Sequence, residues 1–555
     1  MPHPNQIELP PKYYLDNFKS LIAFVQNMYE NILEAREWDF MNRFAALPED
    51  GQCLFLRMMN RRKRFFRVDS FNYAELEITD ELWMELIEQN FASPVSESPE
   101  EYYVEVLALF TKPELTKAAK RLHAESKGLA KLKKTELLEW FLTNVPYADF
   151  LDWLAGKENV LRQGYEEVAS FLLFLYFGNT YGDMTQFVIR DLGNSKFEDF
   201  ADEDFTPYFK TRKDADDKFS IASAYHQFRL MRETSSPEEI FTLFSTWLPK
   251  RDSISTLAFS TYDRLVKRLG EYFEKQKLLD EALHIYQNSD NPPSRERQVR
   301  ILNKQQRIEE ALALCQEIQV SFKNADEKYF AIDFQNRLNK KRVKSTTAYL
   351  KSAPSCEVSA SYQYQVEKGV LMHYQEQGWQ GFHSENFVWR GLFGLFFWDV
   401  LFESVTKSIH NPFQRIPSDL YYPEFFEKRE EHFLERVDLL KNPEEAKKLI
   451  LHNFEYKAGI VTPFIYWDHS LIAGIQLYFQ HIDALLIGKT LLEIARNVRE
   501  NMKGLPDLFL FKEGEYQFLE VKSPNDSLSA QQLHWLHFFE KVGIQAGVMR
   551  VQWSS

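Results

Sequence analysis

The sequence predicts a multidomain, mostly α-helical protein that ends in a small α/β domain. Its 555 residues suffice for roughly three or four domains of ordinary size. Only 20 residues are glycine and 22 are proline, so tight turns are few and long helices are favoured over a sandwich or barrel. Hydrophobic residues make up 44% and aromatic residues 15% of the chain, which is typical of well-filled helix interfaces. From residue 505 onward, short apolar runs bounded by turn residues predict strands instead.

Composition excludes several classes of protein. The three cysteines lie far apart, which excludes a disulfide framework and a cysteine-rich zinc module and suits a reducing compartment. The longest apolar stretch, residues 387–402, contains Arg390 and Asp399 and is shorter than the roughly 20 residues of a membrane span, so we expect a buried helix and no membrane partner. The pattern G-x-x-x-x-G-K-[ST] is missing, so we expect no nucleotide cofactor.

Residues 1–80 are expected to form a helical basic domain. Apolar residues recur at helical spacings from Tyr13 to Arg67. The run from Arg57 to Arg67 carries six basic residues and no acid, which alone is typical of a solvated helix face, but Phe65 and Phe66 interleave with the charges. The net charge of −14 still allows nucleic-acid binding by basic residues gathered on one face. The candidate DNA contacts in this run are Arg57, Arg61, Arg62, Arg64 and Arg67.

Residues 81–155 contain the most basic stretch of the chain. Eight Lys or Arg face two Glu between Lys112 and Lys134. The segment 115–142 resembles a SAP module, a small helix–loop–helix that docks on duplex DNA, although Leu132 stands where such modules usually have glycine. Its candidate DNA contacts are Lys117, Lys120, Lys133 and Lys134.

Residues 156–374 are expected to be an array of helices. The segments 278–286 and 307–315 are similar at an offset of 29 residues, and each carries an alanine, Ala282 or Ala311, where helices of a pair would cross. Small residues at fixed positions let helices approach closely, so the pattern is similar to that of tetratricopeptide-like repeats. The prolines 292 and 293 mark the turn between the two units.

Residues 375–555 carry the candidate chemistry. The runs LPDLFLF and YQFLEVK predict two strands joined by a tight turn at Gly514. Glu520 and Lys522 lie on the same strand face because the side-chain period is two, and Asp507 on the first strand can lie opposite them. Converging carboxylates favour a divalent cation, and Mg²⁺ prefers such oxygen ligands. A surface hairpin with a salt bridge remains the alternative for this pattern alone.

The whole stretch from Gly504 to Phe539 closely resembles the VRR-NUC branch of the PD-(D/E)xK nucleases. The resemblance implies metal binding by Asp507, Glu520 and the carbonyl of Val521, with Lys522 as the catalytic lysine. It also implies that Gln532 lies on the next helix with its amide towards the site, which makes it a further catalytic candidate. We expect Asp526 to cap that helix, and His534 and His537 to serve packing, because hard cations prefer oxygen ligands.

Upstream, FHSENFVWRGLFGLFFWDVLF resembles a segment of the Fanconi-associated nucleases, and Glu385 falls on that family's metal-binding glutamate. The resemblance implies a bacterial, cytoplasmic, nucleoid-associated member that uses one or two Mg²⁺ or Mn²⁺ ions. It implies cleavage of 5′ flaps and 5′-directed excision on branched DNA during interstrand crosslink repair. The alternatives are a Holliday-junction resolvase, which would act as a dimer whereas we expect a monomer, and a non-catalytic DNA-repair scaffold.

Overall fold

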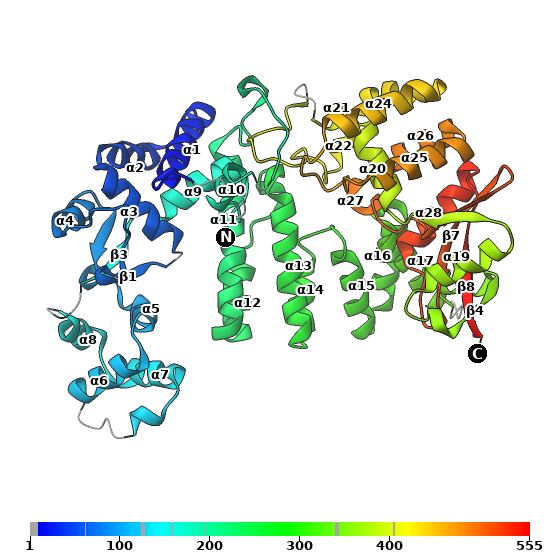
Figure 1. Ribbon diagram of the computed structural model, residues 1–555. Coiled ribbons are helices and arrows are strands. Elements are labelled where there is room, and N and C mark those ends of the chain that lie inside the picture. Colours follow the sequence, from blue (N-terminus) through cyan, green and yellow to red (C-terminus); the bar gives the residue numbers. More distant parts are fainter. Residues whose placement is uncertain are drawn as a thin grey trace. The chain divides into compact units, whose positions relative to one another are not determined.

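The structure is a computed structural model in which the chain forms two compact units (Figure 1). One unit comprises residues 1–194 with 209–212, and the other comprises residues 195–208 with 213–555. The structure describes residues 9–554 apart from 62, 124–127, 156, 158, 194, 339–342 and 403–405. The candidate Arg62 therefore lies outside the described residues.

The first unit combines helices with a small sheet of strand order β1-β3-β2. Its helices are α1 (Tyr13–Tyr29), α2 (Ala35–Ala46), α3 (Glu49–Asn60), α4 (Asp80–Glu88), α5 (Tyr103–Ala108), α6 (Lys112–Leu122), α7 (Lys134–Asn144), α8 (Tyr147–Leu154), α9 (Glu166–Phe177) and α10 (Thr185–Asp191). Its strands are β1 (Phe65–Arg67), β2 (Ala92–Pro94) and β3 (Val160–Gln163).

The prediction of continuous helix up to Arg67 is wrong at its end. Helix α3 stops at Asn60, and β1 pairs antiparallel with β3, with Phe65 opposite Arg162. Phe65 and Phe66 are buried, so they belong to the core and do not interleave with charges on a surface. Strand β3 also interrupts the array of helices predicted for residues 156–374, and its Val160 packs into a core cluster of the first unit.

The helix–loop–helix predicted for segment 115–142 is present as α6 and α7. Leu115 and Leu137 are buried in the cluster that joins α5, α6, α7 and α8. Leu132, at the position usually held by glycine, lies two residues before α7 in extended backbone, which any residue adopts. The helical frame is therefore observed, and its assignment to the SAP class stays a prediction.

The second unit holds a helical array and a larger sheet of strand order β4-β8-β7-β6-β5. Its helices are α11 (Arg212–Thr234), α12 (Pro237–Trp247), α13 (Phe259–Lys275), α14 (Leu279–Tyr286), α15 (Ser294–Lys304), α16 (Ile308–Ser321), α17 (Ala325–Leu338), α18 (Ser345–Ser352), α19 (Val366–Glu376), α20 (Phe387–Phe396), α21 (Trp398–Phe402), α22 (Glu424–Glu427), α23 (Glu430–Asp438), α24 (Pro443–Tyr456), α25 (His469–His481), α26 (Ala484–Arg496), α27 (Val498–Asn501) and α28 (Ala530–Val542). Its strands are β4 (Ser355–Ser359), β5 (Gln380–His383), β6 (Leu508–Lys512), β7 (Glu515–Lys522) and β8 (Ala546–Ser554).

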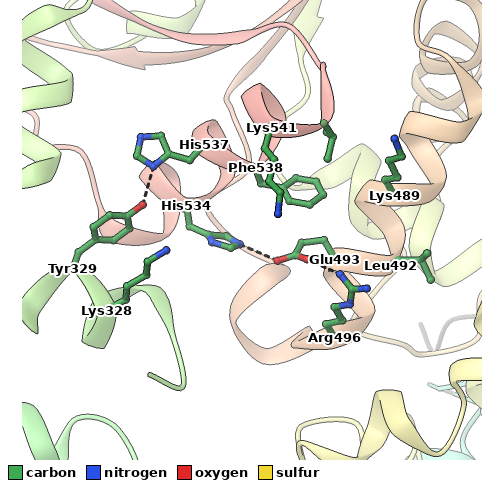
Figure 2. A pocket seen from close by; sticks show the side chains of 11 residues that line it. Lys328, Tyr329, Lys489, Leu492, Glu493, Arg496, His534, His537, Phe538 and Lys541 are labelled. Carbon is green, nitrogen blue, oxygen red and sulfur yellow. Dashed lines mark hydrogen bonds and ion pairs between the residues drawn. The ribbon is translucent and has the colours of Figure 1, made fainter. Parts of the chain in front are cut away.

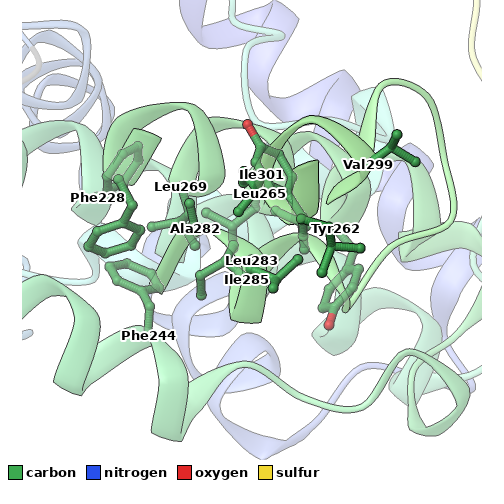
Figure 3. Packing of buried hydrophobic residues seen from close by; sticks show 14 of the residues in the cluster. Phe228, Phe244, Tyr262, Leu265, Leu269, Ala282, Leu283, Ile285, Val299 and Ile301 are labelled. Atoms are coloured by element: carbon green, nitrogen blue, oxygen red, sulfur yellow. The ribbon is translucent and has the colours of Figure 1, made fainter. Parts of the chain in front are cut away.

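The two similar segments form matching helices, α14 and α16, as their repeat predicts. Ala282 and Ala311 are fully buried in one hydrophobic cluster, and Figure 3 shows Ala282 among the side chains of that cluster. Gly270 on α13 serves the same close approach, because a Cβ there would lie 2.4 Å from the ring of Tyr286. Small residues thus set the helix spacing of this array.

The C-terminal hairpin also forms as predicted. Strands β6 and β7 pair antiparallel, with Leu508 opposite Leu519. The turn residues Glu513 and Gly514 both have positive φ, 50° and 88°, which a two-residue hairpin turn requires. Strand β8 then returns parallel to β7 through helix α28, and β4 pairs parallel with β8.

Aromatic residues fill one face of this sheet. Trp389 of α20 and Tyr478 of α25 pack against Phe509, Phe518 and Phe539, with ring centroids about 4.9–6.2 Å apart. The apolar stretch 387–402 is therefore buried helix, as expected, and none of the helices that the structure describes is long and apolar enough to span a membrane.

The predicted domain boundary at residue 375 cuts through this sheet domain. Strand β4 precedes the boundary and pairs with β8, and Val370 of α19 packs on the other face of the sheet with Leu508 and Val521. Hydrophobic burial joins these segments to the C-terminal strands although they are far apart in sequence.

Candidate active site

The strand register brings Asp507 and Glu520 together. Asp507 immediately precedes Leu508, whose partner Leu519 immediately precedes Glu520, so the two carboxylates lie across the strand pair from each other. The amide of Val521 donates a hydrogen bond of 2.8 Å to Oδ2 of Asp507. The main chain of β7 thus fixes the Asp507 carboxylate. Asp507 also lies opposite Glu520, as predicted from the sequence.

Glu520 is the centre of the site and is buried. Its Oε1 accepts hydrogen bonds from Nζ of Lys522 at 2.8 Å and from Nε2 of Gln532 at 2.5 Å. Its Oε2 is also buried but accepts no hydrogen bond from the residues that the structure describes. One oxygen of this carboxylate is therefore anchored, and the other is left for a partner from outside the chain.

The two carboxylates disfavour each other's charge. Burial, followed by the charge of Asp507, raises the pKa of Glu520 to about 8. Burial also raises the pKa of Asp507, although the Val521 amide and Lys522 work in the opposite direction. The single ammonium of Lys522 does not compensate two carboxylates, of which Glu520 is buried and Asp507 is partly buried, so the site favours an additional positive charge.

Helix α28 orients Gln532 through its own N-terminus. Ser529 caps the helix by accepting a hydrogen bond from the Gln532 amide, and Oε1 of Gln532 accepts one from the Ser529 amide in return. This capping box leaves Nε2 of Gln532 directed at Glu520. The expectation that Asp526 caps this helix is wrong: Asp526 instead accepts a hydrogen bond from the amide of Ser523 in the preceding turn.

Glu385 reaches the site through its main chain. The amides of Ser384 and Glu385 both donate to the carbonyl oxygen of Asp507, at 2.8 and 3.0 Å, across 122 residues of sequence. The backbone at Glu385 has a φ of 36°, which is uncommon for a residue other than glycine. Its side chain is exposed and accepts a hydrogen bond of 2.9 Å from the side-chain amide of Asn386.

Asp507 and Glu520 suit a divalent cation of the kind that keeps several waters. Magnesium binds in such sites through one or two carboxylates, and the buried, unpartnered Oε2 of Glu520 is a free ligand atom of the right chemistry. Within the described residues, no three His, Cys, Asp or Glu side chains lie close enough together to hold an ion by themselves. The donor set is therefore the carboxylate pair of Asp507 and Glu520, and the Glu385 side chain does not form a group of three with it in this structure.

Two further ionisable residues lie near Asp507 that the sequence did not single out. The charge of Glu367 on α19 raises the pKa of Asp507, and His383, at the end of β5, lowers it. His383 pairs with Leu508 across the strands, so it flanks Asp507 directly. In the sequence, the indication that His383 lies near the site is its position two residues before the candidate Glu385.

His534 and His537 line a pocket of about 390 Å³ whose lining includes neither Asp507 nor Glu520. Figure 2 shows His534 directed at Glu493, 3.2 Å away, and His537 bonded to Tyr329 at 3.0 Å. Both histidines thus contact other side chains of the protein, and their packing role stays a prediction. The lining is rich in cations and is completed by Lys328, Lys489, Leu492, Arg496, Phe538, Lys541 and Val542.

Three of the four described candidate arginines of the first unit pair with acids. Arg57 contacts Glu75 and stacks on Tyr14, with 4.1 Å between its guanidinium carbon and the ring centroid. Arg61 stacks on Phe71 at 3.8 Å and donates to Ser70.

Arg64 bonds Glu166 at 2.8 Å and also contacts Glu105. Arg67 bonds Glu114 at 2.9 Å. These ion pairs hold β1 against helices that lie far from it in the sequence. These arginines, which were candidate DNA contacts, thus have a structural role within the first unit.

The candidate lysines are placed differently. Lys117 and Lys120 are exposed on α6 and form no ion pair with any described residue. Lys133 and Lys134 are also exposed, and Nζ of Lys134 donates to the carbonyl of Ala108 at 3.0 Å. The α6 lysines are thus the candidate cations whose charge is most available to a phosphate.

Comparison with known proteins identifies two regions by family models. Residues 12–93 match the model described as FAN1, HTH domain, and residues 441–553 match the VRR-NUC domain. The second region contains the carboxylate pair, the lysine and Gln532.

Relatives extend over nearly the whole chain. The Fanconi-associated nuclease 1 homolog of Pseudomonas aeruginosa is 28% identical over 99% of this chain and 97% of its own length. Human Fanconi-associated nuclease 1 is 23% identical over 97% of this chain, which corresponds to 62% of the human protein.

Solved structures agree with this relationship. A crystal structure of paFAN1 bound to 5′-flap DNA with a two-nucleotide flap and a gap superimposes with a TM-score of 0.83 at 25% identity, covering 99% of this chain and all of that one. A second structure, with a one-nucleotide flap, gives the same score at 26% identity. With the carboxylates, lysine and glutamine at the expected strand and helix positions, the chain is similar over nearly its whole length to the Fanconi-associated nucleases.

Proposed function

We propose that this protein is a Mg²⁺- or Mn²⁺-dependent, structure-selective DNA nuclease. It cuts 5′ flaps, excises nucleotides in the 5′ direction and acts in interstrand crosslink repair. The observation that carries the proposal is the pairing of Asp507 and Glu520 beside Lys522, in a chain similar throughout to a nuclease solved with 5′-flap DNA. Its relationship to the Pseudomonas protein supports a cytoplasmic, nucleoid-associated role in a bacterium.

Asp507, Glu520 and the main chain at Val521 would hold the metal, with Glu385 as a further ligand. A divalent ion bound there would polarise the phosphodiester and supply a water of lowered pKa. The protein positions the reacting groups. Lys522, fixed on Oε1 of Glu520, would orient the attacking water or offset charge that develops on the phosphate, and Gln532 would keep the Glu520 carboxylate from turning.

The exposed lysines of α6 would grip duplex DNA by phosphate contacts, which position the substrate without specifying sequence. We propose that the protein acts as a monomer. A single catalytic pair in each chain suits one incision near a flap, whereas symmetric resolution of a junction requires two.

The test is a panel of labelled flap, nicked, gapped and four-way DNA substrates with Mg²⁺, Mn²⁺ and EDTA. We expect metal-dependent incision near the 5′ flap, with little cutting of an intact four-way junction. Preferred cleavage of that junction into symmetric nicked duplexes would make the protein a resolvase. Binding without cleavage in either metal would make it a scaffold.

A further inference from the structure

Tyr466 is an aromatic side chain held out into solvent near the active site. It lies in the loop between α24 and α25, and 73% of its surface is exposed. Its ring contacts the ring of Phe387, with centroids 6.5 Å apart and planes at 63°. Phe387 begins α20, two residues after Glu385, and its amide donates to the carbonyl of Ser384. The amide of Ser384 in turn bonds the carbonyl of Asp507, so short links connect Tyr466 to the carboxylate pair.

The loop that carries Tyr466 is anchored on both sides of it. Phe464 and Ile465 are buried, and a Cβ at Gly394 of α20 would lie 2.6 Å from Phe464, so α20 and the loop are in close contact. On the other side, the indole nitrogen of Trp467 donates to the carbonyl of Ile460 at 2.8 Å. The loop is fixed by its neighbours, and the ring of Tyr466 between them is mostly exposed to solvent apart from its contact with Phe387.

Arg390 adds a second link and a positive charge. It lies one helical turn beyond Phe387 on α20, and its guanidinium donates to the carbonyl of Pro463 in the same loop. A phosphodiester strand that enters the site beside Glu385 would therefore meet a cation and an exposed ring on one edge. Bases have flat π-faces of their own, and stacking on an aromatic side chain is how proteins hold unpaired bases without reading sequence.

We propose that Tyr466 is a base-stacking residue that holds an unpaired base next to the scissile phosphate. This inference rests on the proposed nuclease function and names the part of the substrate that this edge of the site accepts. Tyr466 would fix the strand so that its phosphate stays at Asp507 and Glu520. A duplex end whose bases remain paired would not offer a base to this ring, so the contact favours a strand that has left the helix.

The test uses flap DNA with 2-aminopurine, whose fluorescence is quenched by stacking, placed on either side of the flap junction. Binding is followed in EDTA, and kcat/KM is then measured with Mg²⁺. We expect the wild-type protein to quench one of the two probe positions and Tyr466→Ala to lose that quenching. We expect kcat/KM to fall about 10-fold in Tyr466→Ala, whereas Tyr466→Phe stays within about two-fold of the wild type.

Tyr456→Ala is the matched control. Tyr456 is the last residue of α24, where the same loop begins, and is 70% exposed. Its ring contacts His452 and Lys457. It should match the wild type in both assays. Because Tyr466 is mostly exposed, its variants should have the same melting temperature as the wild type.

The proposal is overturned if Tyr466→Ala quenches and cleaves like the wild type, or if Tyr466→Phe is as defective as Tyr466→Ala, which would indicate a hydroxyl contact. If the wild type does not cut flap DNA at all, the nuclease function fails, while the quenching measurement still decides whether the ring stacks on a base.

Discussion

Replacing Glu520 with glutamine should stabilise the metal-free protein while it abolishes cleavage. The Glu520 side chain is buried, and its pKa rises from 4.5 to about 8 on folding. At pH 7 the folded protein must keep a proton that the unfolded chain has released, which costs about 3 kcal/mol. Glutamine has the same shape without the charge. Its carbonyl oxygen can still accept from Lys522 and Gln532, and its NH₂ group takes the place of the unpartnered Oε2.

The NH₂ group of the glutamine would occupy a buried position where no described residue accepts a hydrogen bond, which offsets part of the benefit, so we expect a net gain of about 1–3 kcal/mol in the free energy of unfolding at pH 7. The sign follows from proton binding: a carboxyl with a raised pKa binds more protons in the folded state. Wild-type stability should therefore fall as the pH rises from about 4.5 to 8, and the advantage of Glu520→Gln should grow over the same range.

Urea unfolding in EDTA at pH 5 and pH 8, followed by tryptophan fluorescence, measures this difference. The same substitution at Glu513, exposed in the turn of the same hairpin, should change stability at neither pH. Added Mg²⁺ should stabilise the wild type and leave Glu520→Gln almost unchanged. A Glu520→Gln protein that unfolds more easily than the wild type at pH 8 in EDTA would refute the reasoning, because the buried charge would then be compensated within the chain.

The remaining predictions concern chemistry and DNA binding. Asp507→Ala should abolish cleavage in a gel assay while DNA affinity stays within a few-fold, because most affinity comes from phosphate contacts elsewhere; comparable losses of both would give Asp507 a structural role. Lys522→Arg should not restore the activity lost in Lys522→Ala, since a planar guanidinium does not replace a compact ammonium. Replacing Lys117 and Lys120 with alanine should flatten the dependence of log affinity on log salt by about 2 units. Arg64→Ala should instead lower the melting temperature and leave that slope unchanged, because Arg64 is held by Glu166 and Glu105.

The C-terminal chemistry was predictable because its signals are local. A strand repeats every two residues and a two-residue turn fixes the register, so the positions of Asp507 and Glu520 follow from the sequence of one hairpin. The register also determines that the Val521 amide meets the Asp507 carboxylate. The paired alanines of the helical array were visible for the same reason, since each marks a crossing within a short repeat.

The acids that pair with the basic segment 57–67 could not be predicted, because they are distant in the sequence. Nothing near Arg64 indicates Glu166, about a hundred residues later, or the strand Val160–Gln163 that β1 pairs with. A run of arginines has the same composition whether it faces solvent or acids on another segment. The two phenylalanines were the better signal, because adjacent buried aromatics at Phe65 and Phe66 fit a strand whose two faces are both covered.

Asp507 joins three segments that sequence order separates. Its carboxylate is held by β7 through Val521, and its carbonyl is held by the amides of Ser384 and Glu385. A change in the turn at Glu385 would therefore shift Asp507 even if the Glu385 carboxylate never touched a metal. Loss of activity in a Glu385 variant does not by itself identify a ligand. Glu385→Gln distinguishes the two roles because it keeps the main-chain hydrogen bonds to Asp507. A raised Mg²⁺ requirement at unchanged melting temperature would assign the Glu385 carboxylate to the metal. An unchanged Mg²⁺ requirement would mean that Glu385 supports Asp507 through its main chain.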